Sequence, residues 1–361
     1  MIPSSASSSA AVISRSRKET SSSTFIASIL GEDGKGMWPL RLSGKSSISS
    51  VVFHKLPPTD TLFLESTTRI LKDPIHSFMD FQVWETPGQI DYLDPQFDVD
   101  AIFADAGALI WVIDAQDDYL DSLNRLHETL VAICPAYPTV NIEVFIHKVD
   151  GLSDDYKLDT QRDVIQRTQD ELTDNGLDFI NVSYHLTSIF DHSIFEAFSK
   201  VIQKLIPQLG TLENLLNALC ANSGIEKAFL FDVLSKIYIA TDSSPVDVQS
   251  YEICSDFIDV IVDVGEIYGF ERKPPAEEGE GVEGGEPAGA GSEAELEEEQ
   301  EPEAMSLIRL QNGMVLYLRE INKYLALICL MRKENIEKQG LVEYNIQVFQ
   351  EALGRVFALQ R

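Results

Sequence analysis

The chain is poor in the residues that build disulfide frameworks and metal clusters. Its 361 residues include four cysteines, which form no CxxC pair, and six histidines, which lack metal-ligand spacing. This pattern predicts buried free thiols in a reducing compartment and argues against a disulfide scaffold or a zinc site.

Positive charge is also scarce. Lys and Arg number 28 against 58 Asp and Glu, which gives a formal net charge of −30. A surface of this sign is repelled by a phosphate backbone, so the composition argues against binding to nucleic acid. It does not argue against a nucleotide site, because such a site is local and includes its own Mg²⁺.

Long apolar runs are absent. The longest, at 324–331, suits a buried strand and is far shorter than the roughly 20 residues that span a bilayer. Ile2 excludes N-myristoylation, and residues 359–361 contain no prenylation box. We therefore expect no direct membrane anchor, so that any membrane association would come through a partner.

The first of two informative motifs is a Gly-Lys-Ser turn that opens a helical pattern. Such a turn offers backbone N–H groups, an ammonium and a hydroxyl to a phosphate chain and its Mg²⁺. The segment predicted to bind phosphate is Ser43-Gly44-Lys45-Ser46-Ser47.

The second motif, His147-Lys148-Val149-Asp150, follows a buried strand at 141–146. Its Asp carboxylate can accept the N1–H and N2–H groups of a guanine ring. Further along the chain, the apolar run from 179 to 182 leads to Ser188 and Ile189, where a backbone N–H could meet the guanine O6.

The segment between the two motifs supplies the remaining parts of such a site. A strand at 79–84 runs into Glu85, whose carboxylate would hold Mg²⁺ through water. The backbone N–H of Gly88 could approach the γ-phosphate, and Gln89 could orient the attacking water. Upstream, Thr67 could add a second hydroxyl to the metal beside that of Ser46. In this order, the segments predict a guanine-nucleotide site with Mg²⁺.

The chain length favours two domains. Residues 1–38 are Ser-rich and predict a disordered tail, for which a transit peptide is an alternative. Residues 39–206 alternate strands with helices, as in a three-layer α/β domain that binds its ligand at the carboxyl ends of the strands. The strands are expected at 62–66, 79–84, 108–114, 141–147 and 179–187, with helices beginning near Ser46, Asp117, Asp159 and Asp191.

Residues 207–361 predict a second, α+β domain that contains a disordered acidic insert at 272–304. We expect five antiparallel strands with both helices on one side, a unit that commonly completes itself by dimerising. After a leading helix at 211–219, the strands are expected at 229–231, 237–240, 307–310, 314–318 and 324–331, and the helices at 246–268 and 344–359.

With these residues in view, the chain resembles the Rag-family GTPases of the C/D type, the fungal second Gtr subunit in particular. The resemblance covers 39–270 and 304–361. It implies a Ras-like P-loop GTPase domain with a mixed, mostly parallel sheet, followed by a roadblock/longin-like dimerisation domain. The tracts that support it are 51–55, 63–67, 112–117, 147–153, 186–189, 192–197, 224–232 and 241–247.

The resemblance also implies cofactors and partners. It implies GTP or GDP with Mg²⁺, and an obligate heterodimer with an A/B-type Rag subunit through the roadblock halves. It further implies a place on the cytoplasmic face of the vacuole or lysosome through a scaffold complex. There such proteins relay amino-acid sufficiency to the target-of-rapamycin kinase complex, and the C/D-type subunit signals positively when it is GDP-bound.

The chain departs from the family pattern before the phosphate loop. The family has Gly directly after a buried strand, whereas Pro39 stands here after the Gly-rich residues 34–38. The nearest apolar run, 25–30, lies too far upstream to match the family spacing. We hypothesise that residues 1–38 derive from a mispredicted first exon, which a transcript encoding this N-terminus would refute. Glu85 stands in place of the usual Asp, and His147 in place of the usual Asn follows the C/D pattern.

Each site residue also has a plainer interpretation. Lys45 and Ser46 could form an ordinary exposed helix start, Asp150 could be a turn residue, and Thr67 and Glu85 could lack any metal role. We interpret the chain as a regulatory GTPase whose weak hydrolysis depends on an activating protein, since no arginine for the transition state is identifiable in the chain. The alternatives are a nucleotide-free dimerisation scaffold and, less favoured, a metabolic P-loop kinase.

Overall fold

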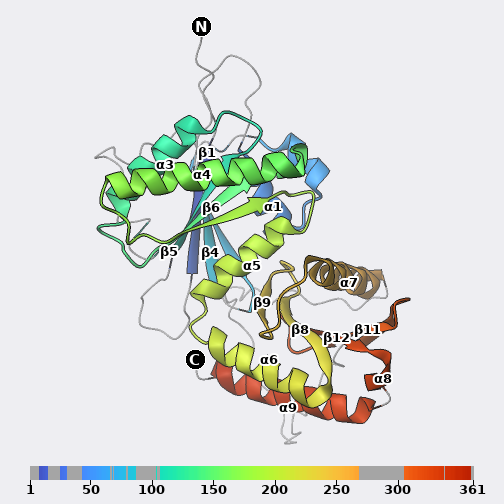
Figure 1. Cartoon of the computed structure of the whole chain (residues 1–361). Helices are drawn as coiled ribbons and strands as arrows, with labels where there is room; N and C mark the ends of the chain where they lie inside the picture. Colours follow the sequence, from blue (N-terminus) through green and yellow to red (C-terminus); the bar gives the residue numbers. More distant parts are fainter. Residues whose placement is uncertain are drawn as a thin grey trace, which may run out of the picture.

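The computed structural model contains an α/β domain followed by a smaller α+β domain (Figure 1). No helix among its described residues is long and apolar enough to cross a bilayer. The structure describes residues 8–14, 25–30, 43–65, 67, 69–78, 80–86, 103, 106–267, 305–336 and 338–358.

A seven-stranded sheet in the order β3-β4-β1-β2-β5-β6-β7 forms the centre of the first domain. Strands β5, β6 and β7 are parallel neighbours, and β3 and β4 form an antiparallel hairpin. The strands are β1 (Ser8–Ser14), β2 (Phe25–Leu30), β3 (Leu71–His76), β4 (Asp80–Glu85), β5 (Ala106–Asp114), β6 (Asn141–His147) and β7 (Val182–Thr187).

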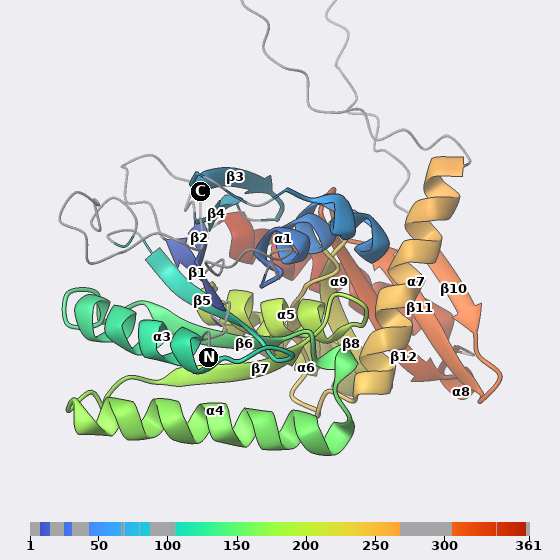
Figure 2. The same cartoon turned by 90° about the horizontal axis from the view of Figure 1, so that it is seen from above.

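Helices cover both faces of this sheet (Figure 2). Successive residues of β5 point to opposite faces, so Leu109 and Trp111 join one apolar cluster while Ile110 and Val112 join the other. The first cluster includes residues of α3 and α4, and the second includes residues of α1 and α5. The predicted three-layer arrangement is therefore confirmed. The helices are α1 (Lys45–His54), α3 (Leu120–Ile133), α4 (Asp154–Asp174) and α5 (Ser193–Leu205).

The strand expected at 62–66 is wrong. Residues Pro58–Phe63 form a 3-10 helix, η1, and the edge strand of the sheet is β3, a few residues further on. Strand β3 contains Pro74 and is exposed at alternate positions. An edge strand of this kind lacks the continuous apolar run by which the buried strands were recognised.

The N-terminal segment contributes two strands where the sequence predicted a disordered tail. In the strand order, β1 and β2 lie between β4 and β5. Strand β2 pairs in parallel with β4 and β5, and β1 pairs antiparallel to β5. The apolar run at 25–30, which we judged too far from the phosphate loop to be the first strand, thus occupies a central position. Residues 31–42, including Pro39, lie outside the described residues.

The second domain contains the predicted five-stranded antiparallel sheet. Its strand order is β10-β11-β12-β8-β9. The predicted acidic insert at 272–304 lies outside the described residues. The elements are α6 (Leu209–Ser223), β8 (Ile225–Asp232), β9 (Tyr238–Thr241), α7 (Val248–Ile267), β10 (Met305–Arg309), β11 (Met314–Glu320), β12 (Leu325–Arg332), α8 (Lys333–Ile336) and α9 (Gln339–Ala358).

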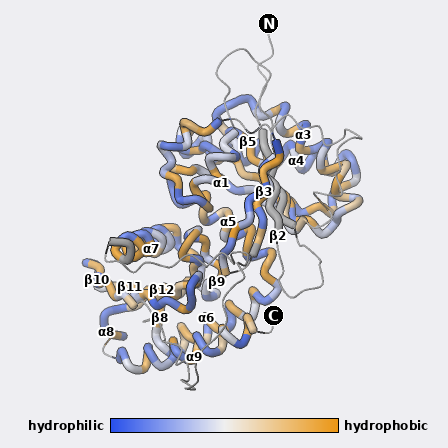
Figure 3. The backbone as a smooth tube through the Cα atoms, turned by 180° about the vertical axis from the view of Figure 1, so that it is seen from behind, coloured by the Kyte–Doolittle hydropathy of each residue, from blue (hydrophilic) through white to orange (hydrophobic). Residues whose placement is uncertain are grey.

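The expectation that both helices cover one side of this sheet is wrong. Helix α7 lies on one face, while α9 lies beside α6 on the other (Figures 1 and 3). Consecutive residues of β8, from Lys227 to Asp232, are all buried, so both faces of this strand require a cover. On the α7 face, the ring of Tyr251 stacks on Phe231 with their centroids 5.9 Å apart.

The two domains share one apolar core and are also joined by hydrogen bonds. The backbone N–H of Tyr238 in β9 donates to Ser199 Oγ in α5 over 3.0 Å. The Ser77 hydroxyl, in the turn between β3 and β4, donates to Asp232 Oδ1 over 2.6 Å. Burial raises the pKa of Asp232, while hydrogen bonds from Ser235 and Ser77 oppose the shift. The turn of the β3–β4 hairpin is therefore attached to the second domain.

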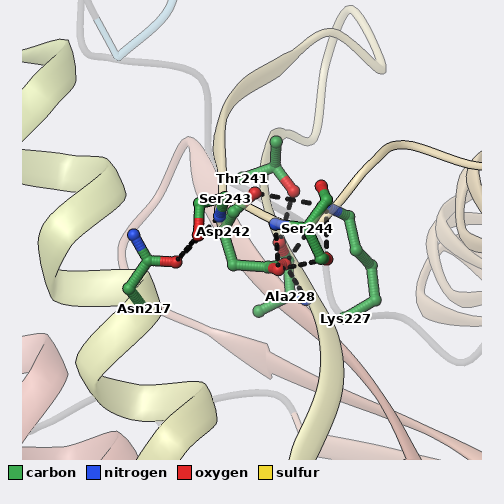
Figure 4. Close-up of polar contacts among 7 residues, drawn as sticks. All are labelled: Asn217, Lys227, Ala228, Thr241, Asp242, Ser243 and Ser244. Carbon is green, nitrogen blue, oxygen red and sulfur yellow. Dashed lines mark hydrogen bonds and ion pairs between the residues drawn. The ribbon is translucent and has the colours of Figure 1, made fainter.

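A buried lysine near the start of β8 binds the segment after β9 (Figure 4). Lys227 is 5% exposed, and its ammonium lies 3.2 Å from Asp242 Oδ1 and 2.7 Å from the carbonyl oxygen of Ser244. Asp242 Oδ1 also accepts the backbone N–H of Ala228 over 2.9 Å. The charges of this buried pair are thus matched and hydrogen-bonded.

The Lys227→Met substitution should destabilise the chain by about 3–5 kcal/mol, because it leaves the Asp242 carboxylate buried without its cation. Urea unfolding of the full chain measures this change. The Arg332→Met variant is the control, because Arg332 pairs with Glu226 at 68% side-chain exposure. The control should change stability by about 1 kcal/mol or less. Equal effects of the two substitutions would contradict the conclusion that the buried Lys227–Asp242 pair stabilises the fold.

Candidate functional site

The phosphate-loop motif forms the start of α1. Gly44 is the N-cap with φ of 97°, and its carbonyl accepts the Ile48 N–H over 2.8 Å. A Cβ at position 44 would lie 2.8 Å from His147 Cδ2, so this position requires glycine for both its backbone angle and its close approach. Ser43 and Lys45 are buried beside it, and Ser47 is half-buried in the first turn. The helix thus presents its N-terminus where an anion could bind.

The three side chains predicted to hold the metal lie together. Thr67 Oγ1 donates to Glu85 Oε1 over 2.6 Å and lies 3.0 Å from Ser46 Oγ. Ser46 Oγ also donates to the same carboxylate oxygen. Two hydroxyls and a carboxylate from three separate segments therefore meet at one point, at the start of α1 and the end of β4.

This set of oxygen donors fits Mg²⁺. The ion prefers oxygen ligands, keeps several waters, and is commonly bound by few protein groups together with substrate phosphates. Within the described part of the chain, no group of three or more His, Cys, Asp or Glu could hold a metal. The hydroxyl-rich set is therefore suited to an ion that phosphate oxygens help to bind.

A pocket of about 490 Å³ opens beside these donors. Its lining includes Ser46, Thr67 and Glu85, and it continues along α1 and β3 as far as His54 and Asp73. His54 Nε2 and Asp73 Oδ2 are 2.5 Å apart at the far end. The metal-binding candidates thus face an open space.

The base-recognition candidates lie at the carboxyl ends of neighbouring parallel strands. Asp114, His147 and Thr187 are paired in register across the ends of β5, β6 and β7. Just beyond this row, Ser188 Oγ donates to Asp150 Oδ1 over 2.7 Å. The loops that carry the two motifs are thereby joined at the carboxylate predicted to read guanine.

Two residues predicted to contact the base, Ser188 and Ile189, make other contacts in the structure. The backbone N–H of Ser188, predicted to meet the guanine O6, donates to Ser193 Oγ over 2.8 Å. The side chain of Ile189 is half-buried and packs against the apolar core, which leaves its backbone as the part that can face a base. Gly88 and Gln89, predicted to serve the γ-phosphate and the attacking water, lie outside the described residues.

His147 is buried between the two halves of the site. Its Nδ1 lies 3.0 Å from Thr187 Oγ1, and its other ring edge faces Gly44. Burial and the neighbouring Lys148 ammonium lower the pKa of His147 to about 3. The imidazole is therefore neutral at physiological pH and links the phosphate loop to the base-binding loops without adding charge.

Sequence reasoning missed two residues that fix Lys148. The Asp114 carboxylate, buried at the end of β5, lies 2.7 Å from Lys148 Nζ. Gln116 Nε2 donates to the Lys148 carbonyl over 2.8 Å, where the Lys148 backbone is left-handed with φ of 63°. The position of Asp114 in the sequence could have identified it, because Asp114 ends a buried parallel strand and ligand sites form at the carboxyl ends of such strands.

The pKa of His147 predicts a pH-dependent stability. Below pH 6.5 the His147 imidazole of the unfolded chain becomes protonated, whereas that of the folded chain stays neutral until about pH 3. The contribution of His147 to the free energy of unfolding therefore falls as the pH drops through that range. Between pH 7.5 and 5.5, wild type should therefore lose about 1.4 kcal/mol more than His147→Asn. Urea unfolding at both pH values measures this difference. An identical pH dependence in the two proteins would contradict the assignment.

Comparison with known proteins agrees with this geometry. Residues 39–258 match the family described as the Gtr1/RagA G protein conserved region. The chain is 61% identical over 321 residues to GTP-binding protein gtr2 of Schizosaccharomyces pombe, which covers 88% of this chain and 96% of that protein. It is 57% identical to human Ras-related GTP-binding protein C over 88% of this chain and 75% of the relative.

Similarity to the other subunit type is much lower. GTP-binding protein gtr1 of Schizosaccharomyces pombe is 26% identical over 232 residues, which cover 60% of this chain and 72% of that protein. The contrast between 61% and 26% identity within one organism separates the two types. The chain therefore belongs to the Gtr/Rag family of GTP-binding proteins, and within it to the C/D type.

Proposed function

We propose that the chain is a regulatory guanine-nucleotide switch that hydrolyses GTP slowly and depends on an activating protein. The observation that best supports this is the convergence of Ser46, Thr67 and Glu85 at the start of α1. A metal and a phosphate chain would be held at this point.

Each side chain has a distinct role at the phosphate end. Backbone N–H groups of 43–47 hold the phosphates, and the Lys45 ammonium binds the β- and γ-oxygens. Ser46 and Thr67 would hold Mg²⁺ directly and Glu85 would hold it through water; the ion, when bound, would neutralise charge that develops on the phosphates. Because Thr67 and Glu85 belong to different segments, loss of the γ-phosphate would release them independently.

The remaining residues select the base and position the attacking water. Asp150 accepts the guanine N1–H and N2–H, and the aliphatic part of Lys148 packs on the ring. The Ser188 backbone N–H serves the guanine O6 once Ser193 Oγ releases it. The Gly88 N–H serves the γ-phosphate, and Gln89 orients the attacking water. We expect slow hydrolysis because no arginine that would stabilise the charge of the transition state is identifiable in the sequence of this chain.

The switch would act within a larger assembly. We infer a heterodimer with an A/B-type Rag subunit through the roadblock-type domain, whose sheet ends in the short edge strands β10 and β9. A scaffold complex would hold the pair on the cytoplasmic face of the vacuole or lysosome, from which it signals to the target-of-rapamycin kinase complex. Membership of the C/D type supports these proposals.

A nucleotide-free dimerisation scaffold is the second candidate. It is favoured by the departure from the family pattern before the phosphate loop, at Pro39, together with a second domain that has its own sheet and helix cover. In this alternative the nucleotide site would be inert while the second domain still dimerises.

The Asp150→Asn substitution separates the two candidates. A working site should lose affinity for GDP by two orders of magnitude or more and gain affinity for xanthosine diphosphate, because the hydrogen-bonding pattern at the base edge is exchanged. Isothermal titration of the full chain measures both. The control is Asp159→Asn on α4, with 73% side-chain exposure, which should bind GDP as wild type does. Absence of GDP binding to wild type would favour the scaffold.

A further inference from the structure

We propose that Phe190 is a base-stacking residue and that its ring covers one face of the bound guanine. The inference rests on the proposed nucleotide site and extends it by one side chain. Phe190 follows directly after Ser188 and Ile189 in the loop between β7 and α5. It is 59% exposed, as are Phe63 (85%) and Phe179 (67%), whereas five other phenylalanines of the α/β domain are buried in its two apolar clusters.

Hydrogen bonds attach Phe190 to the base-reading carboxylate. The Ser188 hydroxyl donates to Asp150 Oδ1 over 2.7 Å and accepts the backbone N–H of Phe190 over 3.1 Å. One side-chain oxygen therefore touches both the carboxylate expected to read the base edge and the residue that carries the exposed ring. The backbone of Phe190 is thus anchored close to the carboxylate that is proposed to read the base edge.

The rest of the loop is fixed as well. The Ser188 N–H donates to Ser193 Oγ over 2.8 Å, and the Ser193 N–H donates to Asp191 Oδ1 over 2.9 Å. Thr187, just before the loop, lies 3.0 Å from the buried His147 ring. A loop with this many internal contacts loses little conformational freedom on binding, so a ring that it presents is preorganised for stacking.

The other apolar side chain of this loop, Ile189, contacts the core, so Phe190 is the exposed apolar residue of the loop. On the other side of the site, the ammonium of Lys148 is fixed by Asp114 at 2.7 Å, so the aliphatic part of Lys148 is held in place beside Gly44. We infer that guanine lies between this aliphatic chain and the Phe190 ring.

A single exposed phenylalanine can also be an ordinary surface residue. The chain offers a matched comparison, because Phe179 is 67% exposed and lies before the opposite end of β7, away from Asp150. If exposure alone explained Phe190, the two residues would respond alike to substitution.

The test is isothermal titration of GDP and Mg²⁺ into the full chain and its Phe190→Ala, Phe190→Tyr and Phe179→Ala variants. Loss of an aromatic ring that stacks on a base weakens binding by about ten- to a hundredfold, which is the effect expected for Phe190→Ala. Phe190→Tyr keeps the ring and should bind nearly as wild type does, and Phe179→Ala should be indistinguishable from wild type. Thermal unfolding without nucleotide checks that all the variants fold alike.

A second titration separates stacking from recognition of the base edge. In the Asp150→Asn background, addition of Phe190→Ala should weaken xanthosine diphosphate by the same factor as it weakens GDP in wild type, because stacking does not depend on edge hydrogen bonds. Wild-type GDP affinity in Phe190→Ala would overturn the inference and leave the proposed function intact. Failure of wild type to bind GDP would overturn both.

Discussion

The parallel pairing of β5, β6 and β7 is the constraint on which the candidate site depends. Because these strands are buried on both faces, their register is fixed, and a shift of one residue would move every apolar side chain to the wrong face. In the observed register, Asp114, His147 and Thr187 form one row across the carboxyl ends. The residues that follow the row, Lys148 and Ser188, are placed by it.

This row also determines the electrostatics of the base site. The buried Asp114 carboxylate neutralises the Lys148 ammonium, and His147 remains uncharged because burial and Lys148 lower its pKa to about 3. Asp150 is an exposed carboxylate at this site and accepts the Ser188 hydroxyl. In the proposed function, such a site would distinguish guanine by hydrogen bonds at the ring edge and hold it by packing on the ring faces.

The sequence could predict the parts of the fold that depend on buried apolar runs. The strand at 141–147 matches β6, and the five-stranded antiparallel sheet of the second domain was also anticipated, because such runs have few other interpretations. The edge strand β3 was missed because it has little apolar patterning. The position of α7 was missed because a fully buried strand such as β8 does not reveal which helix covers which face.

For the candidate site, motif spacing placed Ser46, Thr67, Glu85 and Asp150 before any contact was known. It could not place Asp114 or Phe190, since neither belongs to a spacing pattern. Asp114 is identified by its 2.7 Å distance to Lys148, and Phe190 by its exposure beside a hydrogen-bonded loop. Such contacts depend on the register of neighbouring strands, which cannot be predicted from the spacing of motifs along the sequence.

The most direct test is a fluorescent-GDP titration of this 361-residue chain, co-purified with the proposed A/B-type Rag partner, with Mg²⁺ and again with EDTA. The account predicts tight binding that weakens when Mg²⁺ is removed, because Ser46, Thr67 and Glu85 would hold the ion against the phosphates. No binding by an intact heterodimer would contradict it and leave the chain a dimerisation scaffold.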